Sequence, residues 1–378
     1  SMIYLNKNTK YILFLLIYIC IQLNTLAQDA NYSQFFNNPI YYNPAYAGIN
    51  KGLRASLNYR NQWPNLPNDF RTYSFSMDIA ERRIPGSGGI GLIFNKDVAG
   101  AGFLETTNAG LALSTRIPMG IKFYTQVGIM ASIIQKSVDW TKFVFTDQLN
   151  PKYGNINNSN FIPLEQDNNV YPDFDIGAIF RFVDDKDISD AKTVGTIGAA
   201  IFHVFRPNES FFIDNSNLER RIVIHMDVLF QNMDRYKKHR LKKKTSSHYT
   251  KINPGIIYQN QGEFQSFALG LNIFKYPIYL GLWYRNEDFD FSKSESLIAM
   301  LGINTNFSED IRMKMLYSFD MALQNNIVGA GGAHEFTLIF EFDSLELFSK
   351  SNSSSSFNRD IGNARRKSNM DRLECSPF

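Results

Sequence analysis

The chain has 378 residues, of which 44% are hydrophobic, 20% charged and 14% aromatic, and its formal net charge is only +3. This composition excludes a disordered chain, a collagen-like fibre and a polybasic arm for nucleic acid. The 19 tyrosines and 32 phenylalanines are heavy aromatic usage, which is typical of rings on β-strands or at a membrane interface. The composition therefore favours a β-rich or membrane protein.

The start of the chain predicts a secretory signal peptide. Two lysines precede an apolar run over residues 11–23, and Thr25 and Ala27 are small residues at the positions that signal peptidase inspects. The run is shorter than the roughly 20 residues that span a bilayer as a helix, so a retained membrane anchor is the weaker interpretation. We therefore expect residues 1–27 to be removed on export.

The rest of the chain contains no stretch of about 18 consecutive apolar residues, so no transmembrane helix is expected after export. Residues 71–79, 310–320 and 334–342 instead alternate apolar with polar or small side chains. This is the pattern of strands that face lipid on one side and a lumen on the other. A soluble antiparallel sandwich also alternates, so the number of strands and the lengths of their connections must decide.

Fourteen strands are predicted between residues 51 and 342, and an even number is what a bacterial outer-membrane barrel requires. The expected strands are residues 52–61, 69–80, 88–97, 103–116, 120–134, 173–182, 193–205, 221–231, 251–260, 263–274, 277–286, 295–306, 310–320 and 333–342. Short connections at 118–119, 275–276 and 307–309 contrast with long ones at 135–172, 206–220 and 321–332. Because such barrels have short periplasmic turns and longer extracellular loops, residues 51–342 predict an all-β fold, a transmembrane antiparallel β-barrel with both termini in the periplasm.

One connection on the predicted periplasmic side, residues 232–250, is long and carries the only dense charge run in the sequence. Its basic residues are Arg235, Lys237, Lys238, Arg240, Lys242, Lys243 and Lys244. A solvated loop is the simplest interpretation, and docking of an acidic periplasmic partner is the alternative. No nucleic acid is expected as a partner, because the compartment argues against it.

Residues 28–50 show neither the period of a strand nor that of a helix. Asn38-Pro39 and Asn43-Pro44 predict two turns, because a residue before proline is held extended and an asparagine side chain can cap the backbone. Five aromatic rings between Phe35 and Tyr46 are too many for a free linker, so we expect them to pack. The segment is interpreted as a plug or strut in the barrel mouth, with a recognition surface for a partner as the alternative.

Several stretches resemble one protein family. They are SQFFNNPIYYNPAYAG at residues 33–48, YRNQW at 59–63, GLWYRNEDFD at 281–290, GGAHEFTLIFEF at 331–342 and CSPF at 375–378. Together they resemble the PorP/SprF family of outer-membrane proteins of the type IX secretion system. The residues that match are Asn43, Pro44, Ala45, Tyr46, Ala47, Gly48, Tyr284, Arg285, His334, Glu335, Cys375, Pro377 and Phe378.

The resemblance implies a single barrel in the cell outer membrane that supports secretion or surface anchoring of a large adhesin by the type IX secretion and gliding-motility machinery. Implied partners are the C-terminal region of that adhesin, periplasmic lipoprotein components of the machine and outer-membrane lipid. The candidate partner-binding residues are Asn43 to Gly48 together with Lys237, Lys238, Arg240, Lys242, Lys243 and Lys244. A passive porin or solute channel is the alternative function.

The end of the chain departs from the family pattern. Residues 343–378 are expected to form a periplasmic tail beyond the last strand. The family tail usually ends Cys-Pro-x-Phe, whereas Ser376 stands between Cys375 and Pro377 here. Any role of a Cys-Pro step in processing or contacts is therefore in doubt for this chain.

No enzyme activity and no cofactor are expected. The five histidines form no HExxH or HxxxH spacing, and neither a GxSxG nor a GxxxxGK[ST] motif occurs. His334 beside Glu335 is more typical of a structural hydrogen bond than of an acid–base pair. Arg285 and Glu335 could pair across a lumen, although pairing of each with an adjacent strand or with water is favoured.

Overall fold

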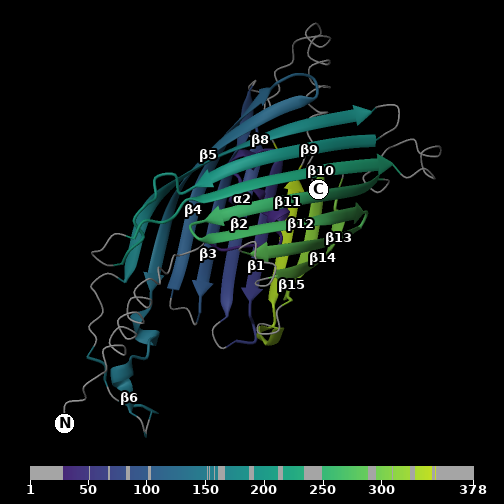
Figure 1. Ribbon diagram of the computed structural model, residues 1–378. Helices are drawn as coiled ribbons and strands as arrows, with labels where there is room; N and C mark the ends of the chain where they lie inside the picture. The colour runs from purple at the N-terminus through teal and green to yellow at the C-terminus, as the bar shows by residue number, and fades with distance from the viewer. Residues whose placement is uncertain are drawn as a thin grey trace, which may run out of the picture.

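The computed structural model describes residues 29–50, 52–66, 69–81, 86–100, 104–150, 152, 154–156, 158–160, 167–186, 191–211, 216–233, 249–287, 295–308, 310–323, 328–342 and 345. Fourteen strands form one closed antiparallel barrel, in which the first strand pairs with the last (Figure 1). This confirms the predicted all-β barrel of about fourteen strands. No helix in the described part of the chain is long and apolar enough to cross a membrane.

The barrel strands match the predicted strands one for one. They are β1 (Leu53–Gln62), β2 (Phe70–Ala80), β3 (Ser87–Ala99), β4 (Leu104–Pro118), β5 (Phe123–Val138), β8 (Asn168–Lys186), β9 (Ala191–Phe202), β10 (Arg221–Met233), β11 (Tyr249–Gln261), β12 (Phe264–Lys275), β13 (Ile278–Glu287), β14 (Glu295–Asn306), β15 (Ile311–Ala322) and β16 (Ala333–Phe342). Closure leaves no free edge where the strands pair, so most of their backbone groups hydrogen-bond within the barrel.

Side chains alternate between the lumen and the outer surface along the strands. On β1, Arg54, Asn58 and Arg60 are buried, whereas Leu57 is 49% exposed. Exposed aliphatic side chains continue around the outer face at Leu92, Leu111, Ile129, Ile176, Ile197, Met226, Leu280 and Leu301. An apolar exterior around a polar interior is the arrangement of a barrel that sits in lipid.

The connections differ in length between the two ends of the barrel. Residues 119–122, 276–277 and 307–310 make short turns at one end, here called the short-turn end. The opposite, long-loop end carries residues 139–167 and 203–220. The first of these loops contains η3 (Trp140–Lys142), η4 (Thr146–Gln148) and the small hairpin of β6 (Leu149–Asn150) and β7 (Gly154–Asn155), and it extends beyond the barrel at the bottom of Figure 1.

Several predicted strand boundaries are wrong. The loop expected over residues 135–172 is shorter, because β5 continues to Val138 and β8 already begins at Asn168. The polar composition of residues 168–169 concealed the start of this strand, whose inward side chains include the buried Tyr171. Conversely, the strand expected to reach residue 205 ends at Phe202, because His203 has a left-handed φ of 56°.

Candidate functional site

The segment of residues 29–50, here called the N-terminal segment, lies inside the barrel and folds into three short helical turns: η1 (Phe35–Asn37), α2 (Pro39–Tyr42) and η2 (Pro44–Tyr46) (Figure 1). Proline stands in the first turn of both α2 and η2, where a backbone N–H has no acceptor within the helix. Every residue from 37 to 50 is buried. The strands of the barrel therefore enclose this segment.

Aromatic rings form the centre of this packing. The ring of Phe35 meets Trp283 of β13 edge-on at 4.7 Å between centroids, and Tyr32 meets Tyr41 in the same way at 4.8 Å. Trp283 is fully buried, and its indole N–H donates a hydrogen bond to Asn272 Oδ1 at 2.9 Å. Such edge-on pairs are a favoured arrangement of aromatic rings, so the lumen is filled by an ordered core.

The Asn43-Pro44 turn is docked onto β8. Asn43 Oδ1 accepts a hydrogen bond from the backbone N–H of Ala45 at 3.0 Å, and its Nδ2 donates to the carbonyl oxygen of Ala178 at 3.1 Å. A Cβ atom on Gly177 would lie 2.1 Å from Asn43 Oδ1. Only glycine therefore allows the strand and the turn to approach this closely.

The second half of the NPAYAG signature contacts other strands. Tyr46 Oη lies 3.3 Å from His225 Nδ1 on β10. Gly48, with a φ of 65°, donates its N–H to Asp78 Oδ2 on β2 at 3.0 Å, and a Cβ atom on it would lie 2.5 Å from Gly89 Cα on β3. The signature thus attaches the N-terminal segment to several strands, and its residues are buried rather than displayed.

Four buried charged side chains join the start of this segment to the barrel wall. Arg60 lies 3.5 Å from Asp320 Oδ2 and 3.4 Å from Glu335 Oε2, and Arg285 also pairs with Asp320. The backbone N–H of Ser33 donates to Glu335 Oε2 at 2.6 Å. Two cations and two carboxylates balance in charge, as ions inside a protein must.

The pairing of Arg285 with Glu335 that the sequence allowed is therefore not the observed one. Among the described residues, Glu335 pairs with Arg60 across the β1–β16 ladder, as the adjacent-strand alternative expected. Arg285 reaches Asp320 on β15, two strands away from its own. The curvature of a closed barrel brings these inward side chains together.

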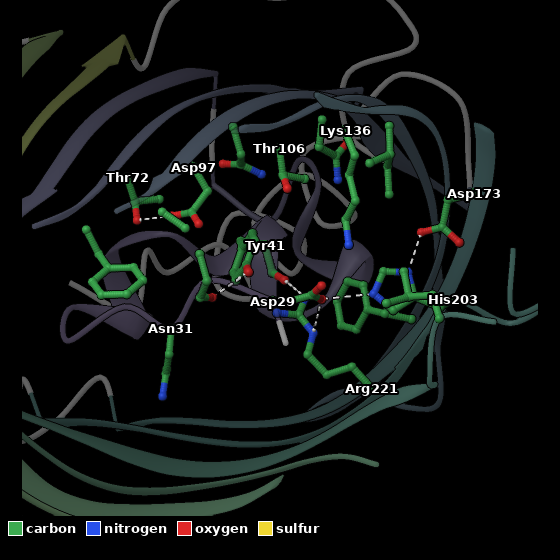
Figure 2. A pocket seen from close by; sticks show the side chains of 18 of the residues that line it. Asp29, Asn31, Tyr41, Thr72, Asp97, Thr106, Lys136, Asp173, His203 and Arg221 are labelled. Atoms are coloured by element: carbon green, nitrogen blue, oxygen red, sulfur yellow. Dashed lines mark hydrogen bonds and ion pairs between the residues drawn. The ribbon is translucent and has the colours of Figure 1, made fainter. Parts of the chain in front are cut away.

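A cavity of about 470 Å³ lies over the N-terminal segment at the long-loop end (Figure 2). Its wall includes strand ends that carry Trp63, Phe70, Lys136, His203 and Phe264, together with Asp29 of the segment itself. Asp29 lies at this end, where its backbone N–H donates a hydrogen bond to Gln261 Oε1 at 3.0 Å, so residues 29–50 run through the lumen before they enter β1.

His203 is the centre of a charged cluster in this cavity (Figure 2). Its Nδ1 lies 2.7 Å from Asp173 Oδ2, and its Nε2 lies 2.9 Å from Asp29 Oδ2. Its backbone N–H donates to Asp175 Oδ1 at 3.0 Å. Asp173 and Asp175 are two residues apart on the lumenal face of β8, so one strand presents a carboxylate to the ring of His203 and another to its backbone N–H.

Arg221 completes the cluster at the start of β10. Its Nε lies 3.3 Å from Asp29 Oδ2, and Nη2 donates to the carbonyl oxygen of Tyr41 at 3.0 Å. The guanidinium carbon lies 4.4 Å from the centre of the Tyr41 ring and 4.1 Å from that of Phe202. Stacking on two rings in a buried site favours arginine over lysine here.

Burial and neighbouring charges shift the pKa values of this cluster in opposite directions. Burial alone would raise the pKa of the Asp29 carboxyl, but His203 and Arg221 outweigh it and hold that pKa well below its usual value. Burial would likewise lower the pKa of His203, but the carboxylates of Asp29 and Asp173 outweigh it and raise that pKa to about 10. With a proton on each ring nitrogen, His203 bridges the N-terminal segment to β8.

The profile of one family, described as "Type IX secretion system membrane protein PorP/SprF", matches residues 24–340. The chain belongs to the PorP/SprF family. This confirms the resemblance seen in the sequence and makes the protein an outer-membrane β-barrel of the type IX secretion system. No curated protein sequence matches the chain significantly.

Several solved structures are similar to this PorP/SprF chain. A FadL homologue from Pseudomonas aeruginosa has 9% identity and a TM-score of 0.40, with 81% of this chain and 94% of that chain covered. The β domain of the Bordetella autotransporter BrkA has 9% identity and a TM-score of 0.36, with 78% and 99% covered. The COG4313 outer membrane channel from Pseudomonas putida F1 has 10% identity and a TM-score of 0.35, with 83% and 99% covered. These low TM-scores give the likenesses no weight in the functional argument.

The later PorP/SprF signature residues divide between the two faces of the barrel. Tyr284 is half-buried on the outer face, with its ring 6.4 Å from that of Phe267. His334 is also on the outer face, and its Nδ1 lies 2.8 Å from Tyr317 Oη, whereas Glu335 points into the lumen. His334 and Glu335 therefore cannot act on one another as an acid–base pair.

The remaining predicted site residues lie outside the described residues. They are Arg235, Lys237, Lys238, Arg240, Lys242, Lys243, Lys244, Cys375, Pro377 and Phe378. The proposed signal peptide, residues 1–27, lies outside them as well.

Sequence reasoning missed the cluster at the long-loop end. Asp173 and Asp175 could have been recognised as two acids on one face of a strand, since residues two positions apart in a strand point to the same side. Nothing in the sequence joined them to Asp29, His203 or Arg221, which come from other parts of the chain. Only closure of the barrel brings these groups together.

Proposed function

We propose that this PorP/SprF barrel supports secretion or surface anchoring of a large adhesin-type protein, whose C-terminal region it receives. The observation that carries this proposal is the filled lumen, in which the N-terminal segment packs on Trp283 and is bonded to Glu335. A passive porin requires a continuous water-filled path through the barrel. An interior built as a core therefore favours an interaction component of the secretion machine over the porin alternative.

The long-loop end is the side on which we place the adhesin. The loop between β5 and β8 exposes Val144, Leu149 and Ile156 by more than half of their surface. We assign these exposed apolar side chains to contact with the adhesin. Asn43 to Gly48 are buried, so in this proposal they support the site by holding the N-terminal segment in place rather than by touching the adhesin.

The short-turn end is the side on which we place the periplasmic partners. At that end β10 finishes at Met233 and β11 begins at Tyr249, and the basic run lies between these two residues in the sequence. Its seven Lys and Arg residues suit an acidic surface, which we assign to a lipoprotein component of the secretion and gliding-motility machinery.

A mild-detergent pull-down of the tagged protein from its native outer membrane tests this function. Mass spectrometry should find a very large secreted protein at stoichiometric levels, and a truncated form of that protein without its C-terminal region should not be retained. Recovery of the barrel alone, together with ion conductance of the purified protein in planar bilayers, would support the porin instead.

A further inference from the structure

We propose that Asp173, Asp175 and His203 form a binding site for one divalent transition-metal ion at the long-loop end of the lumen. Each of the three offers a ligand atom, and these atoms all lie within 4.8 Å of one another. All three side chains are buried and line the cavity of about 470 Å³, which supplies an entry path for a hydrated ion. This site is independent of the proposed adhesin function.

The surroundings of His203 are those of a metal-binding imidazole. Its Nδ1 faces Asp173, and its Nε2 lies 2.9 Å from Asp29 Oδ2. Metal-ligating histidines almost always donate their other ring N–H to a carboxylate or carbonyl oxygen, which fixes the tautomer and orients the ring. Asp29 is placed to accept that hydrogen bond, so the ion would bind at Nδ1 and displace the proton held there.

Two buried polar groups at this place lack a hydrogen bond within the described part of the chain. Asp173 is 2% exposed, and its Oδ1 has no hydrogen-bond partner. Tyr171 precedes it by two residues on the same lumenal face of β8, lines the same cavity and has a hydroxyl group without a hydrogen-bond partner. Polar groups left unsatisfied in this way are costly unless a water or an ion completes them. A hydrated cation would provide such partners.

The charge balance points the same way. Three carboxylates, those of Asp29, Asp173 and Asp175, face one guanidinium, that of Arg221, and one imidazole. Carboxylates therefore outnumber the guanidinium in this buried cluster, and a bound divalent cation would offset their charge.

The ligand types select the class of metal. One imidazole and two carboxylates suit Zn²⁺ or Mn²⁺, whereas Ca²⁺ prefers a shell of six to eight oxygen atoms. Because Asp29 belongs to the N-terminal segment and the ligands belong to the barrel, a bound ion would strengthen the attachment of the segment at this end. The ion would thus act as a clamp between two parts of the chain.

Titration of the full-length protein, purified in detergent and stripped with EDTA, tests the site. Isothermal calorimetry with ZnCl₂ and MnCl₂ should each show one strong site per barrel, and elemental analysis after gel filtration should give the same stoichiometry. CaCl₂ should bind more weakly than either. Asp173→Asn should abolish the strong site, and Asp29→Asn should weaken it about 10- to 100-fold, as removal of an outer-shell partner does.

Asp97→Asn is the matched control. Asp97 lines the same cavity but accepts a hydrogen bond from Thr72 Oγ1, at 2.6 Å, and is no part of the cluster. Its replacement should leave Zn²⁺ binding unchanged. Absence of stoichiometric Zn²⁺ or Mn²⁺ in the wild type, tighter binding of Ca²⁺, or equal binding by Asp173→Asn and Asp97→Asn would each overturn the proposal. Metal binding by the wild type tests the proposal even if a variant does not fold.

Discussion

Asn43 lies against Gly177 so closely that a single methyl group on the glycine would be 2.1 Å from the amide oxygen of the asparagine. The contact joins the N-terminal segment to the middle of β8. Gly177 is therefore one position at which the addition of a single methyl group would push the segment away from the wall.

Gly177→Ala should therefore loosen the segment without breaking β8. We expect a loss of about 1–3 kcal/mol of stability, the usual cost of an extra carbon in a packed interior. The loss should appear as a lower temperature of heat-induced unfolding on gels and as faster proteolysis near Asn43. Gly195→Ala is the control, because a Cβ atom there meets no atom within 4 Å. Equal behaviour of the two variants would contradict the close contact.

Glu335→Gln should destabilise the folded barrel strongly. The substitution removes one partner from Arg60 and leaves a buried guanidinium short of negative charge, which typically costs about 3–5 kcal/mol. Glu105→Gln breaks the exposed pair with Lys96, whose atoms lie 2.8 Å apart, and should cost less than about 1 kcal/mol. A denaturant titration of both variants in detergent compares their free energies of unfolding. If Glu335→Gln loses no more stability than Glu105→Gln, the buried charges around Arg60 are dispensable for the fold.

The orientation of the barrel can be tested with single cysteines in a Cys375→Ser background. The two substitutions are Val144→Cys and Ser308→Cys. Val144 lies on a loop at the long-loop end, Ser308 lies in a turn at the short-turn end, and both are exposed. A membrane-impermeant maleimide added to intact cells should label the first and not the second, because long loops face outwards in such barrels. The reverse pattern would invert the assignment of both ends.

Neutralising the basic run tests the periplasmic partner separately from the adhesin. Replacement of its seven Lys and Arg residues by glutamine should reduce the amount of periplasmic lipoprotein that co-purifies several-fold. Added salt should lower lipoprotein recovery with the wild type more than with this variant. Retention of the secreted protein should not change. Unaltered lipoprotein recovery would leave the run as an ordinary solvated loop.

The sequence alone predicted most of the fold because each barrel strand carries its own alternation of apolar and polar side chains. Alternation in strands such as residues 310–320 follows from lipid on one side and a packed lumen on the other. Errors arose where the local rule was interrupted, at the polar start of β8 and at the left-handed His203. The hydrogen bonds of His203 join it to residues 28, 30 and 174 positions away in the sequence, and no local pattern encodes such contacts.

The passage of the N-terminal segment through the lumen connects residues ahead of the first barrel strand to the last barrel strand. Ser33 and Gln34 bond to Glu335 on β16, the last strand of the barrel in the described part of the chain. Until β16 joins β1, Arg60 and the segment both lack this carboxylate. Assembly of the barrel is therefore complete only when its last strand has met its first residues, so a chain truncated before β16 loses the closing seam and the anchor of its interior together.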